Sequence, residues 1–402
     1  MNDQLPAVGP ARAGLSDDVD LVVIGAGIVG LAHASLALAE GWSVVVVDRD
    51  HEAVGASVRN FGHACITAQS GDLHTMAKSS RRHLLAMAEK AGFRAAEAGA
   101  VVIARTPAEL AILEELAAAR EAGEVQLLDA EETSSRIGRS DAEGILGGAW
   151  LRDDLRVDPR TTVAALAAWV DAQPRGEVRW NTTALGADGA SGAQGDQTVV
   201  VRTSRGTLHA RRAIVCVGND VDRLWPELAA EHQIQRCVLQ MARVQMAHDE
   251  ASAEPEIVPA VLTATSMLRY PAFTDMPSAQ GLREQVVAAQ PELLEIGANV
   301  MCTQRPDGTL LVGDSHAYSL TAAPFLDERT SQILLDEHRA VLGRDLTVIE
   351  RWQGVYASSD VAPYLVRDVA PGVTVVSVTS GVGMTLSFGL AERTLAAMAP
   401  TP

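Results

Sequence analysis

Three glycines and one aspartate near the start of the chain have the types and the spacing that dinucleotide binding requires. Gly25, Gly27 and Gly30 stand in the order G-x-G-x-x-G, directly after the apolar run at residues 21–24. In such a motif the first glycine permits a tight turn, the second lets a pyrophosphate approach the backbone, and the third lets a helix pack on a strand. Asp48 closes the next apolar run, where an acid accepts hydrogen bonds from a ribose hydroxyl. NAD and FAD share this pattern, so the motif alone leaves both cofactors open.

The elements that must position this motif are a strand, a helix and a second strand. Residues 21–24 and 44–47 are short β-branched runs that predict buried strands, and residues 28–40 predict the helix between them. Because such a helix begins with unpaired N–H groups and the positive end of its dipole, a pyrophosphate can bind there. Residues 211–218 predict another buried strand, which ends at Gly218 and would return to the same sheet, near the cofactor.

A loop of small and polar residues follows the second strand. Residues 55–65 have neither helical nor strand periodicity. Ser57 is small enough for a ligand to approach the backbone, and Asn60 and His63 can donate hydrogen bonds. We expect this loop to lie over the cofactor, with an ordinary surface loop as the alternative.

Composition bounds the remaining possibilities. The chain has 402 residues, a formal net charge of −18 and four scattered cysteines without a C-x-x-C pair. The charge argues against nucleic acid and anionic membranes as partners. The sequence contains no apolar run long enough to predict a membrane span, and the cysteines indicate a reducing cytoplasm with neither a disulfide framework nor a zinc site. Residues 1–18 are expected to form a flexible tail.

The second half of the chain predicts more strands and a second glycine-led helix. Residues 234–325 are expected to be β-rich, with strands that include 261–265 and 267–270. A buried strand at 373–378 leads through Gly381 and Gly383 into the last helix, whose first N–H groups offer partial positive charge. The glycines at 186–195 lack a following helix and predict a hairpin tip.

These features together resemble the D-amino-acid oxidase-like family of FAD oxidoreductases, which includes glycine oxidase and sarcosine oxidase. The resemblance covers nearly the whole chain and is carried by the Rossmann start, the strand ending Cys-Val-Gly and the C-terminal Gly-Val-Gly-Met-Thr-Leu-Ser-Phe-Gly-Leu-Ala. Four segments also look like the subgroup linked to aminophosphonate catabolism: Ser-Val-Arg-Asn-Phe-Gly-His at 57–63, Leu-Arg-Tyr-Pro-Ala-Phe at 268–273, Gly-Asp-Ser-His at 313–316 and Arg-Trp-Gln-Gly-Val-Tyr at 351–356.

The resemblance implies an α/β fold in which a Rossmann-type FAD-binding domain carries a second, β-rich (α+β) substrate domain. The FAD-binding domain would comprise residues 19–98, 145–230 and 345–402, and the substrate domain residues 99–144 and 231–344. The cofactor-binding candidates are Gly25, Gly27, Gly30, Asp48, Arg49, Ser57, Asn60, Phe61, Gly62, Gly218, Gly381, Gly383, Met384 and Thr385. Some relatives bind flavin through a cysteine seven residues before the aspartate of a Pro-Asp turn. Here that position is Val300 and Cys302 is out of register, so we expect non-covalent FAD.

The chemistry expected from the resemblance is oxidation of an amine to an imine that water hydrolyses. The protein would favour the deprotonated amine and hold an anionic end of the substrate with an arginine, whose fork suits carboxylate or phosphonate. The arginine candidates are Arg243, Arg269, Arg305 and Arg351, with Arg269 preferred. His63 and His316 are candidates for tuning protonation, and a structural role is the alternative for both. The catalytic candidates are therefore His63, Arg269, Tyr270, His316 and Tyr356, with no metal ligand among them.

Several functions stay open at this point. An aminophosphonate or its N-methyl derivative is the preferred substrate, and glycine, sarcosine or a D-amino acid is the alternative. Reduced flavin would pass electrons to molecular oxygen or, in a dehydrogenase, to another acceptor. A nicotinamide-dependent reductase would need a second nucleotide loop, and a flavin carrier without catalysis would not need a large substrate domain.

Overall fold

The first sheet of the computed structural model is built around the strand that precedes the glycine motif. The structure describes residues 15–191, 197–247 and 257–398. In this sheet β1, β2, β9, β12 and β20 run parallel, so the carboxyl ends of the inner strands meet at one edge. Antiparallel strands extend it on the β12 side. Its strands are β1 (Asp18–Ile24), β2 (Val44–Val47), β9 (Gly176–Arg179), β10 (Ala184–Ser191), β11 (Gln197–Thr203), β12 (Gly206–Val215), β19 (Tyr364–Ala370) and β20 (Val373–Val378).

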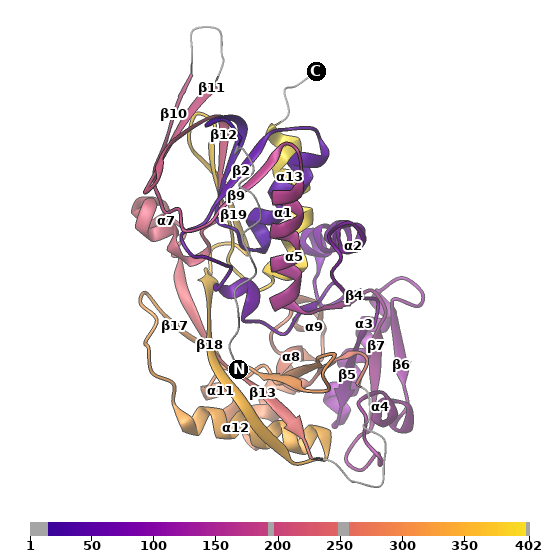
Figure 1. Ribbon diagram of the computed structural model, residues 1–402. Helices are drawn as coiled ribbons and strands as arrows, with labels where there is room; N and C mark the ends of the chain where they lie inside the picture. Colours follow the sequence, from indigo (N-terminus) through magenta and orange to yellow (C-terminus); the bar gives the residue numbers. More distant parts are fainter. Residues whose placement is uncertain (1–14, 192–196, 248–256, 399–402) are drawn as a thin grey trace, which may run out of the picture.

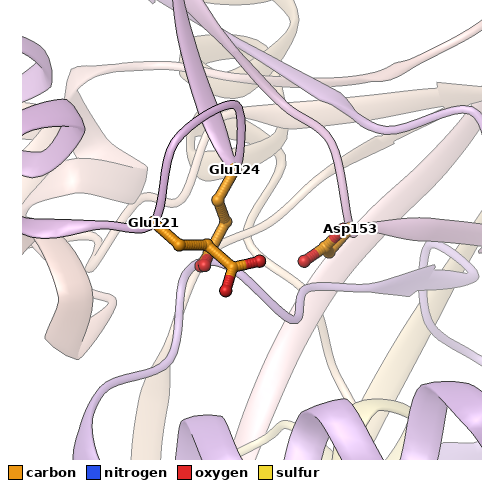
Figure 2. Close-up of side chains that lie close together, drawn as sticks. All are labelled: Glu121, Glu124 and Asp153. Atoms are coloured by element: carbon orange, nitrogen blue, oxygen red, sulfur yellow. The ribbon is translucent and has the colours of Figure 1, made fainter.

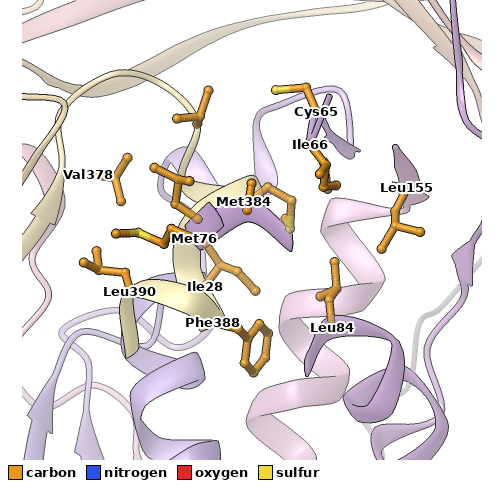
Figure 3. Packing of buried hydrophobic residues seen from close by; sticks show 14 of the residues in the cluster. Ile28, Cys65, Ile66, Met76, Leu84, Leu155, Val378, Met384, Phe388 and Leu390 are labelled. Atoms are coloured by element: carbon orange, nitrogen blue, oxygen red, sulfur yellow. The ribbon is translucent and has the colours of Figure 1, made fainter. Parts of the chain in front are cut away.

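A layer of helices covers one face of this sheet. It consists of α1 (Ile28–Ala39), α2 (Gly71–Ala91), α5 (Pro159–Ala172) and α13 (Gly383–Met398), which lie together in Figure 1. The C-terminal α13 packs against both α1 and α2. Figure 3 shows the contact, in which Phe388 and Met384 of α13 lie among Ile28 of α1 and Met76 and Leu84 of α2. Phe388 is fully buried, and burial of such a side chain stabilises a fold by about 1.5–3 kcal/mol.

The second sheet is mixed and mostly antiparallel. Its longest pairing joins β13 to β18 along nearly their whole lengths. Its strands are β5 (Ala100–Ala104), β6 (Val125–Leu128), β7 (Gly147–Leu151), β13 (Gln235–Met246), β14 (Ala260–Leu262), β15 (Met301–Gln304), β16 (Leu310–Gly313), β17 (Ala317–Ser319) and β18 (Leu346–Ser358). Figure 1 shows β18 running from this sheet towards the first one.

The remaining elements connect and cover the two sheets. A small sheet joins β3 (His63–Ala64), β4 (Ala95–Ala96) and β8 (Leu155–Val157). The other helices are η1 (Ala56–Val58), α3 (Pro107–Ala119), α4 (Ala130–Arg136), η2 (Gly218–Asp220), α6 (Val221–Leu224), α7 (Pro226–Glu231), α8 (Ala264–Met267), α9 (Pro271–Thr274), α10 (Ala279–Ala289), α11 (Pro291–Glu295) and α12 (Glu328–Leu342). Within the described residues, no helix is long and apolar enough to cross a membrane.

This architecture confirms the expected α/β fold with a parallel sheet and a second, β-rich part. Strands β7 and β18 lie in ranges expected to belong to the FAD-binding domain, but both pair in the second sheet. The division into domains therefore stays a prediction. Most of the expected tail, residues 1–14, lies outside the described residues, and β1 already begins at Asp18. Residues 186–191 belong to β10, and the hairpin tip itself lies outside the described residues.

The strand expected at residues 267–270 is wrong. Strand β14 ends at Leu262, and the chain then forms the helical turns of α8 and α9. Thr263 explains the change, since its carbonyl accepts hydrogen bonds from Ser266 and Met267 and its hydroxyl donates to the Val300 carbonyl at 2.9 Å. These bonds replace a strand ladder and place Arg269 between two short helices.

Candidate functional site

A cavity of about 930 Å³ opens at the carboxyl ends of the inner strands and extends to residues of the second sheet. Its size lies in the upper part of the range of about 300–1,000 Å³ that is typical of small-molecule sites. Its walls include the turns that follow β1, β2, β12 and β20 and residues of β13, β15 and β18. Binding at this edge of a parallel sheet is the general rule for open α/β folds.

The glycine motif forms one wall of the cavity. Gly25 has φ +108°, and a Cβ there would lie 2.4 Å from the Cys216 carbonyl oxygen, so the turn requires glycine. Gly27 also lines the cavity. Gly30 does not line it; a Cβ there would lie 2.0 Å from the Gly25 carbonyl oxygen, which explains the close packing of α1 on its strand.

Asp48 lines the cavity and also holds the glycine turn. Its carboxylate accepts hydrogen bonds from the backbone N–H of Ala26 at 2.7 Å and of Asp50 at 3.0 Å. Burial raises the pKa of Asp48. A carboxylate has about four lone-pair sites, so Asp48 keeps capacity for a ligand. Arg49 also lines the cavity, where it pairs with Asp220 at 2.6 Å.

The loop at residues 55–65 is part of the cavity wall rather than an ordinary surface loop. Ser57, Asn60, Phe61 and His63 line the cavity, and the Ser57 hydroxyl accepts a hydrogen bond from the Ile28 N–H at the start of α1. The amide of Asn60 donates to carbonyls of the loop itself and accepts from Gly62, so it fixes the loop.

Gly62 does not line the cavity. It has φ +70°, and a Cβ there would lie 1.9 Å from the Val157 carbonyl oxygen, so Gly62 lets the loop approach β8.

His63 has a buried carboxylate partner that the sequence did not indicate. Its Nε2 lies 2.8 Å from Asp154 Oδ2, and the other oxygen of Asp154 accepts a hydrogen bond from the Thr67 N–H. Both side chains are almost fully buried. Within the described part of the chain, Nδ1 of His63 has no hydrogen-bond partner. The pair therefore holds the ring at the cavity wall with one nitrogen available.

The start of α13 forms the wall next to this loop. Gly381, Gly383, Met384 and Thr385 line the cavity, as does Gly218 after β12. Thr385 ties the two walls together, since its hydroxyl accepts a hydrogen bond from the Cys65 N–H at 3.0 Å. Figure 3 shows Met384 and Cys65 in this region.

The second sheet contributes a cluster of polar and aromatic side chains. Arg269 donates a hydrogen bond to the Tyr356 hydroxyl at 2.8 Å, and both residues line the cavity. The rings of His316 and Tyr356 meet edge to face with centroids 6.4 Å apart. Nδ1 of His316 lies 2.8 Å from the Gly297 carbonyl oxygen. The structure thus brings together four predicted residues, since Tyr270 also lines this part of the wall.

The protonation of this cluster follows from burial. Burial, and then the charge of Arg269, lower the pKa of His316 well below its ordinary value. Burial raises the pKa of both Tyr270 and Tyr356. At neutral pH His316 and the two tyrosines are therefore neutral, and Arg269 carries the positive charge of the cluster.

Among the four arginine candidates, only Arg269 lines the cavity. The other three are occupied by carboxylates: Arg243 pairs with Glu350 at 2.9 Å, Arg305 with Asp158 at 3.2 Å and Arg351 with Glu328 at 3.0 Å. In the described ranges, Arg269 forms no ion pair with a carboxylate; Asp314 acts on it through charge alone, and its hydrogen-bond partner is the Tyr356 hydroxyl.

Sequence reasoning missed Asp314, which also lines the cavity beside this cluster. Burial raises the pKa of Asp314 to about 7, although Arg269 opposes the shift. The sequence did contain a signal for this residue, because Asp314 lies in the Gly-Asp-Ser-His segment at 313–316, one of the four that resemble the aminophosphonate-linked subgroup. Asp154 had no comparable signal, since nothing in its local sequence links it to His63.

A separate group of carboxylates lies away from the cavity. Figure 2 shows Glu121, Glu124 and Asp153 close together. Basic side chains already pair with all of them: Arg152 lies 2.8 Å from Glu121 and 2.7 Å from Asp153, and Lys78 lies 3.1 Å from Glu124. This group is therefore an ion-pair network.

Comparisons with known proteins agree with the architecture. The model of the family described as FAD dependent oxidoreductase (DAO) matches residues 20–397. Glycine oxidase from Geobacillus kaustophilus has a similar structure, with a TM-score of 0.72, 18% sequence identity and coverage of 96% of each chain. L-proline dehydrogenase from P. horikoshii gives a TM-score of 0.73 at 16% identity, covering 96% of this chain and 94% of its own.

A third similar structure is iminodiacetate oxidase from Chelativorans sp. BNC1, with a TM-score of 0.69, 19% identity and coverage of 95% of this chain and 97% of its own. At these identities the likeness shows the fold. A search of curated protein sequences gives no match.

Proposed function

Because the chain belongs to the DAO family of FAD-dependent oxidoreductases, we propose that it oxidises the C–N bond of a small anionic amine. The preferred substrate is an aminophosphonate or its N-methyl derivative, and the product is an imine that water hydrolyses. When bound, FAD supplies the acceptor for the hydride equivalent that leaves the carbon next to nitrogen. The protein contributes binding, orientation and electrostatics.

The residues of the cavity fit FAD. The turn requires glycine at position 25, and Gly27 lines the cavity without a side chain, so its backbone is accessible to a pyrophosphate. Asp48 keeps free lone pairs for a ribose hydroxyl. The N-terminus of α13 borders the same cavity, and its partial positive charge suits an electron-rich ring.

We infer that the flavin is held without a covalent bond. Cys302 is buried outside the cavity. Cys65 lines the cavity, but burial raises the pKa of its thiol to about 12, so the reactive thiolate is scarce at neutral pH. Acid precipitation should therefore leave a colourless protein pellet.

One observation carries the anionic substrate: Arg269 lines the cavity as a cation without a carboxylate partner among the described residues. The other arginines of the wall are engaged. Arg49, Arg223 and Arg236 pair with Asp220. Arg59, like Arg269, has no carboxylate partner among the described residues, and it donates to the Gln353 carbonyl. Because a net charge of −18 repels anions at long range, an anionic substrate needs such a local cation.

The choice of an aminophosphonate over an amino acid is supported by the segments that resemble the aminophosphonate-linked subgroup, one of which contains Arg269. An arginine fork binds carboxylate as well as phosphonate, so glycine and sarcosine are the competing substrates.

The test compares kcat/KM for 2-aminoethylphosphonate, its N-methyl derivative, sarcosine, glycine and D-alanine, with oxygen and with an artificial acceptor. The proposal expects one of the two phosphonates to lead the ranking with at least one acceptor. A ranking led by neutral amines or by amino acids would overturn it.

A further inference from the structure

Asp314 is held rigidly at the wall of the cavity. It follows directly after β16, and its backbone N–H and carbonyl exchange hydrogen bonds of 2.8 Å with the carbonyl and N–H of Asn299. Its side chain is only 5% exposed and lines the same cavity as Arg269. The fold thus fixes a carboxyl group at the substrate end of the site.

One oxygen of this carboxyl is unsatisfied. Within the described ranges, Oδ1 of Asp314 is buried and has no hydrogen-bond partner. Its other oxygen lies 3.9 Å from Nε2 of His316, beyond hydrogen-bond distance. The side chain of Asn299 hydrogen-bonds to the carboxyl group and opposes the rise of its pKa, but leaves Oδ1 without a partner. Most buried polar atoms in proteins have a partner, so an unpaired one in a cavity wall calls for a ligand that donates a hydrogen bond.

The other carboxylates of the cavity wall are engaged. Asp48 accepts two backbone N–H groups, while Asp220 and Asp222 pair with Arg236 at 3.3 and 2.8 Å. Asp50 pairs with Arg49 at 3.6 Å. Asp314 differs from them because, among the described residues, its carboxyl has no ion pair with an arginine or lysine and Arg269 acts on it through charge alone.

The titratable groups that face Asp314 come from several elements. They are Arg269 and Tyr270 from the segment between α8 and α9, His316 from the loop after β16, and Cys237 from β13. Burial raises the pKa of Tyr270 and of Cys237 and lowers that of His316, so these three are neutral. Asp314 and Arg269 are therefore the two groups of this cluster that carry charge near neutral pH.

We propose that Asp314 binds the ammonium group of the substrate and accepts the proton that must leave nitrogen before oxidation. In this step an N–H bond of the ammonium breaks and an O–H bond forms at Oδ1 of Asp314, which leaves a neutral amine with its lone pair. The inference rests on the proposed function, because it requires an amine that enters the site protonated.

Arg269 and Asp314 together then select a small zwitterion. Arg269 takes the anionic end and Asp314 the cationic end, so the substrate class is an amine that carries a phosphonate or carboxylate group. An unperturbed alkylammonium has a pKa of about 10, so it needs a base to lose its proton at neutral pH. A buried carboxyl with a raised pKa of about 7 is matched to that task.

The decisive experiment is the pH dependence of kcat/KM for the best amine substrate, measured on the holoenzyme and on Asp314→Asn. Wild type should give a bell: kcat/KM rises as Asp314 ionises near pH 7 and falls as the free substrate loses its ammonium proton. Asp314→Asn must instead bind the neutral amine, so its kcat/KM should lie about 100-fold or more below wild type at pH 7 and rise up to the pKa of the substrate.

Asp336→Asn is the matched control. Asp336 is an exposed carboxylate of α12, paired with Arg339, so the substitution removes the same charge far from the cavity wall. This variant should keep the wild-type bell. A bell retained in Asp314→Asn, with flavin bound, would overturn the proposal.

A second measurement needs wild type alone and covers the case in which Asp314→Asn does not fold. With amines of different pKa, the alkaline limb should move with the amine while the acid limb stays near pH 7. A single limb that follows the amine pKa would overturn the role of Asp314. This result is distinct from failure of the proposed function. If amines without an anionic group lead the substrate ranking, the same pH profile can be recorded with one of them.

Discussion

The guanidinium of Arg269 donates a hydrogen bond of 2.8 Å to the hydroxyl of Tyr356, although the two residues are 87 positions apart. Tyr356 lies opposite Cys237 on the neighbouring strand β13, so the strand register fixes the position of Tyr356 along the sheet. The bond orients Arg269 without neutralising it. The cation therefore remains available to an anionic ligand in the cavity.

Replacement of Arg269 should weaken the binding of anionic substrates more than that of other amines. Arg269→Lys keeps the charge but loses the fork, so KM for a phosphonate should rise; Arg269→Met should cost on the order of 2–5 kcal/mol in kcat/KM if the pair is desolvated. Tyr356→Phe should raise KM more than it lowers kcat. The control is Arg351→Met, since Arg351 pairs with Glu328 outside the cavity. An unchanged preference for anionic amines in Arg269→Met would contradict this account.

Gly27→Val should abolish FAD binding. Gly27 lines the cavity and a Cβ there would lie 3.0 Å from the Ser57 hydroxyl, so the Cβ and the two methyl groups of valine would fill the space proposed for the pyrophosphate. Gly281→Val is the matched control, because Gly281 is exposed on α10 and a Cβ there meets nothing within 4 Å. Flavin absorbance per protein reports the result, and full occupancy in Gly27→Val would show that the cofactor lies elsewhere.

Asp48→Asn should weaken FAD binding more than it slows turnover. The substitution keeps the shape of the side chain but removes charge-assisted hydrogen bonds, each worth about 1.5–3 kcal/mol. Part of the loss in affinity would come from the weaker hydrogen bond that the side chain accepts from the Ala26 N–H. Fluorescence titration of the apoprotein with FAD gives the affinity. A large fall in kcat at saturating FAD with unchanged affinity would remove Asp48 from this role.

The free energy of unfolding should depend on pH through the titration of Asp314. Because its pKa rises from 3.8 in the unfolded chain to about 7 in the fold, the unfolded state loses the proton first and stability falls as pH rises through this window. Asp314→Asn lacks that slope. The free energy of unfolding of Asp314→Asn, relative to wild type, should therefore increase from pH 4 to pH 7 and then level off, at a difference of no more than roughly 4 kcal/mol.

Thermal unfolding of both apoproteins between pH 4 and pH 9 measures this difference. A stability gap that does not change with pH would mean that Asp314 titrates in the fold as it does in water.

The sequence predicted those parts of the site that lie within one contiguous motif. Gly25, Asp48 and the glycines before α13 were identified because a strand, a turn and a helix follow one another along the chain. The pairs His63–Asp154 and Arg269–Tyr356 depend on contacts between distant segments, which no local pattern specifies. Periodicity also failed around residues 263–270, where threonine and serine bonds to nearby backbone outweigh strand propensity.

Sheet membership was similarly beyond the sequence. Residues 346–356 predict a long strand, but the pairing of β18 with β13 rather than with the first sheet depends on tertiary packing. That pairing is what brings Tyr356 to Arg269.

The most direct test of the hypothesis that the substrate is an amine with an anionic group is anaerobic reduction of the bound flavin. This experiment isolates the C–N oxidation from the choice of electron acceptor. N-methyl-2-aminoethylphosphonate is compared with 2-(methylamino)ethanol, in which a neutral hydroxyl replaces the phosphonate, and NADH serves as a further control. We expect the phosphonate to bleach the flavin at concentrations where the amino alcohol and NADH do not, and we expect Arg269→Met to remove this advantage. Faster bleaching by the neutral amine, or by NADH, would contradict the hypothesis.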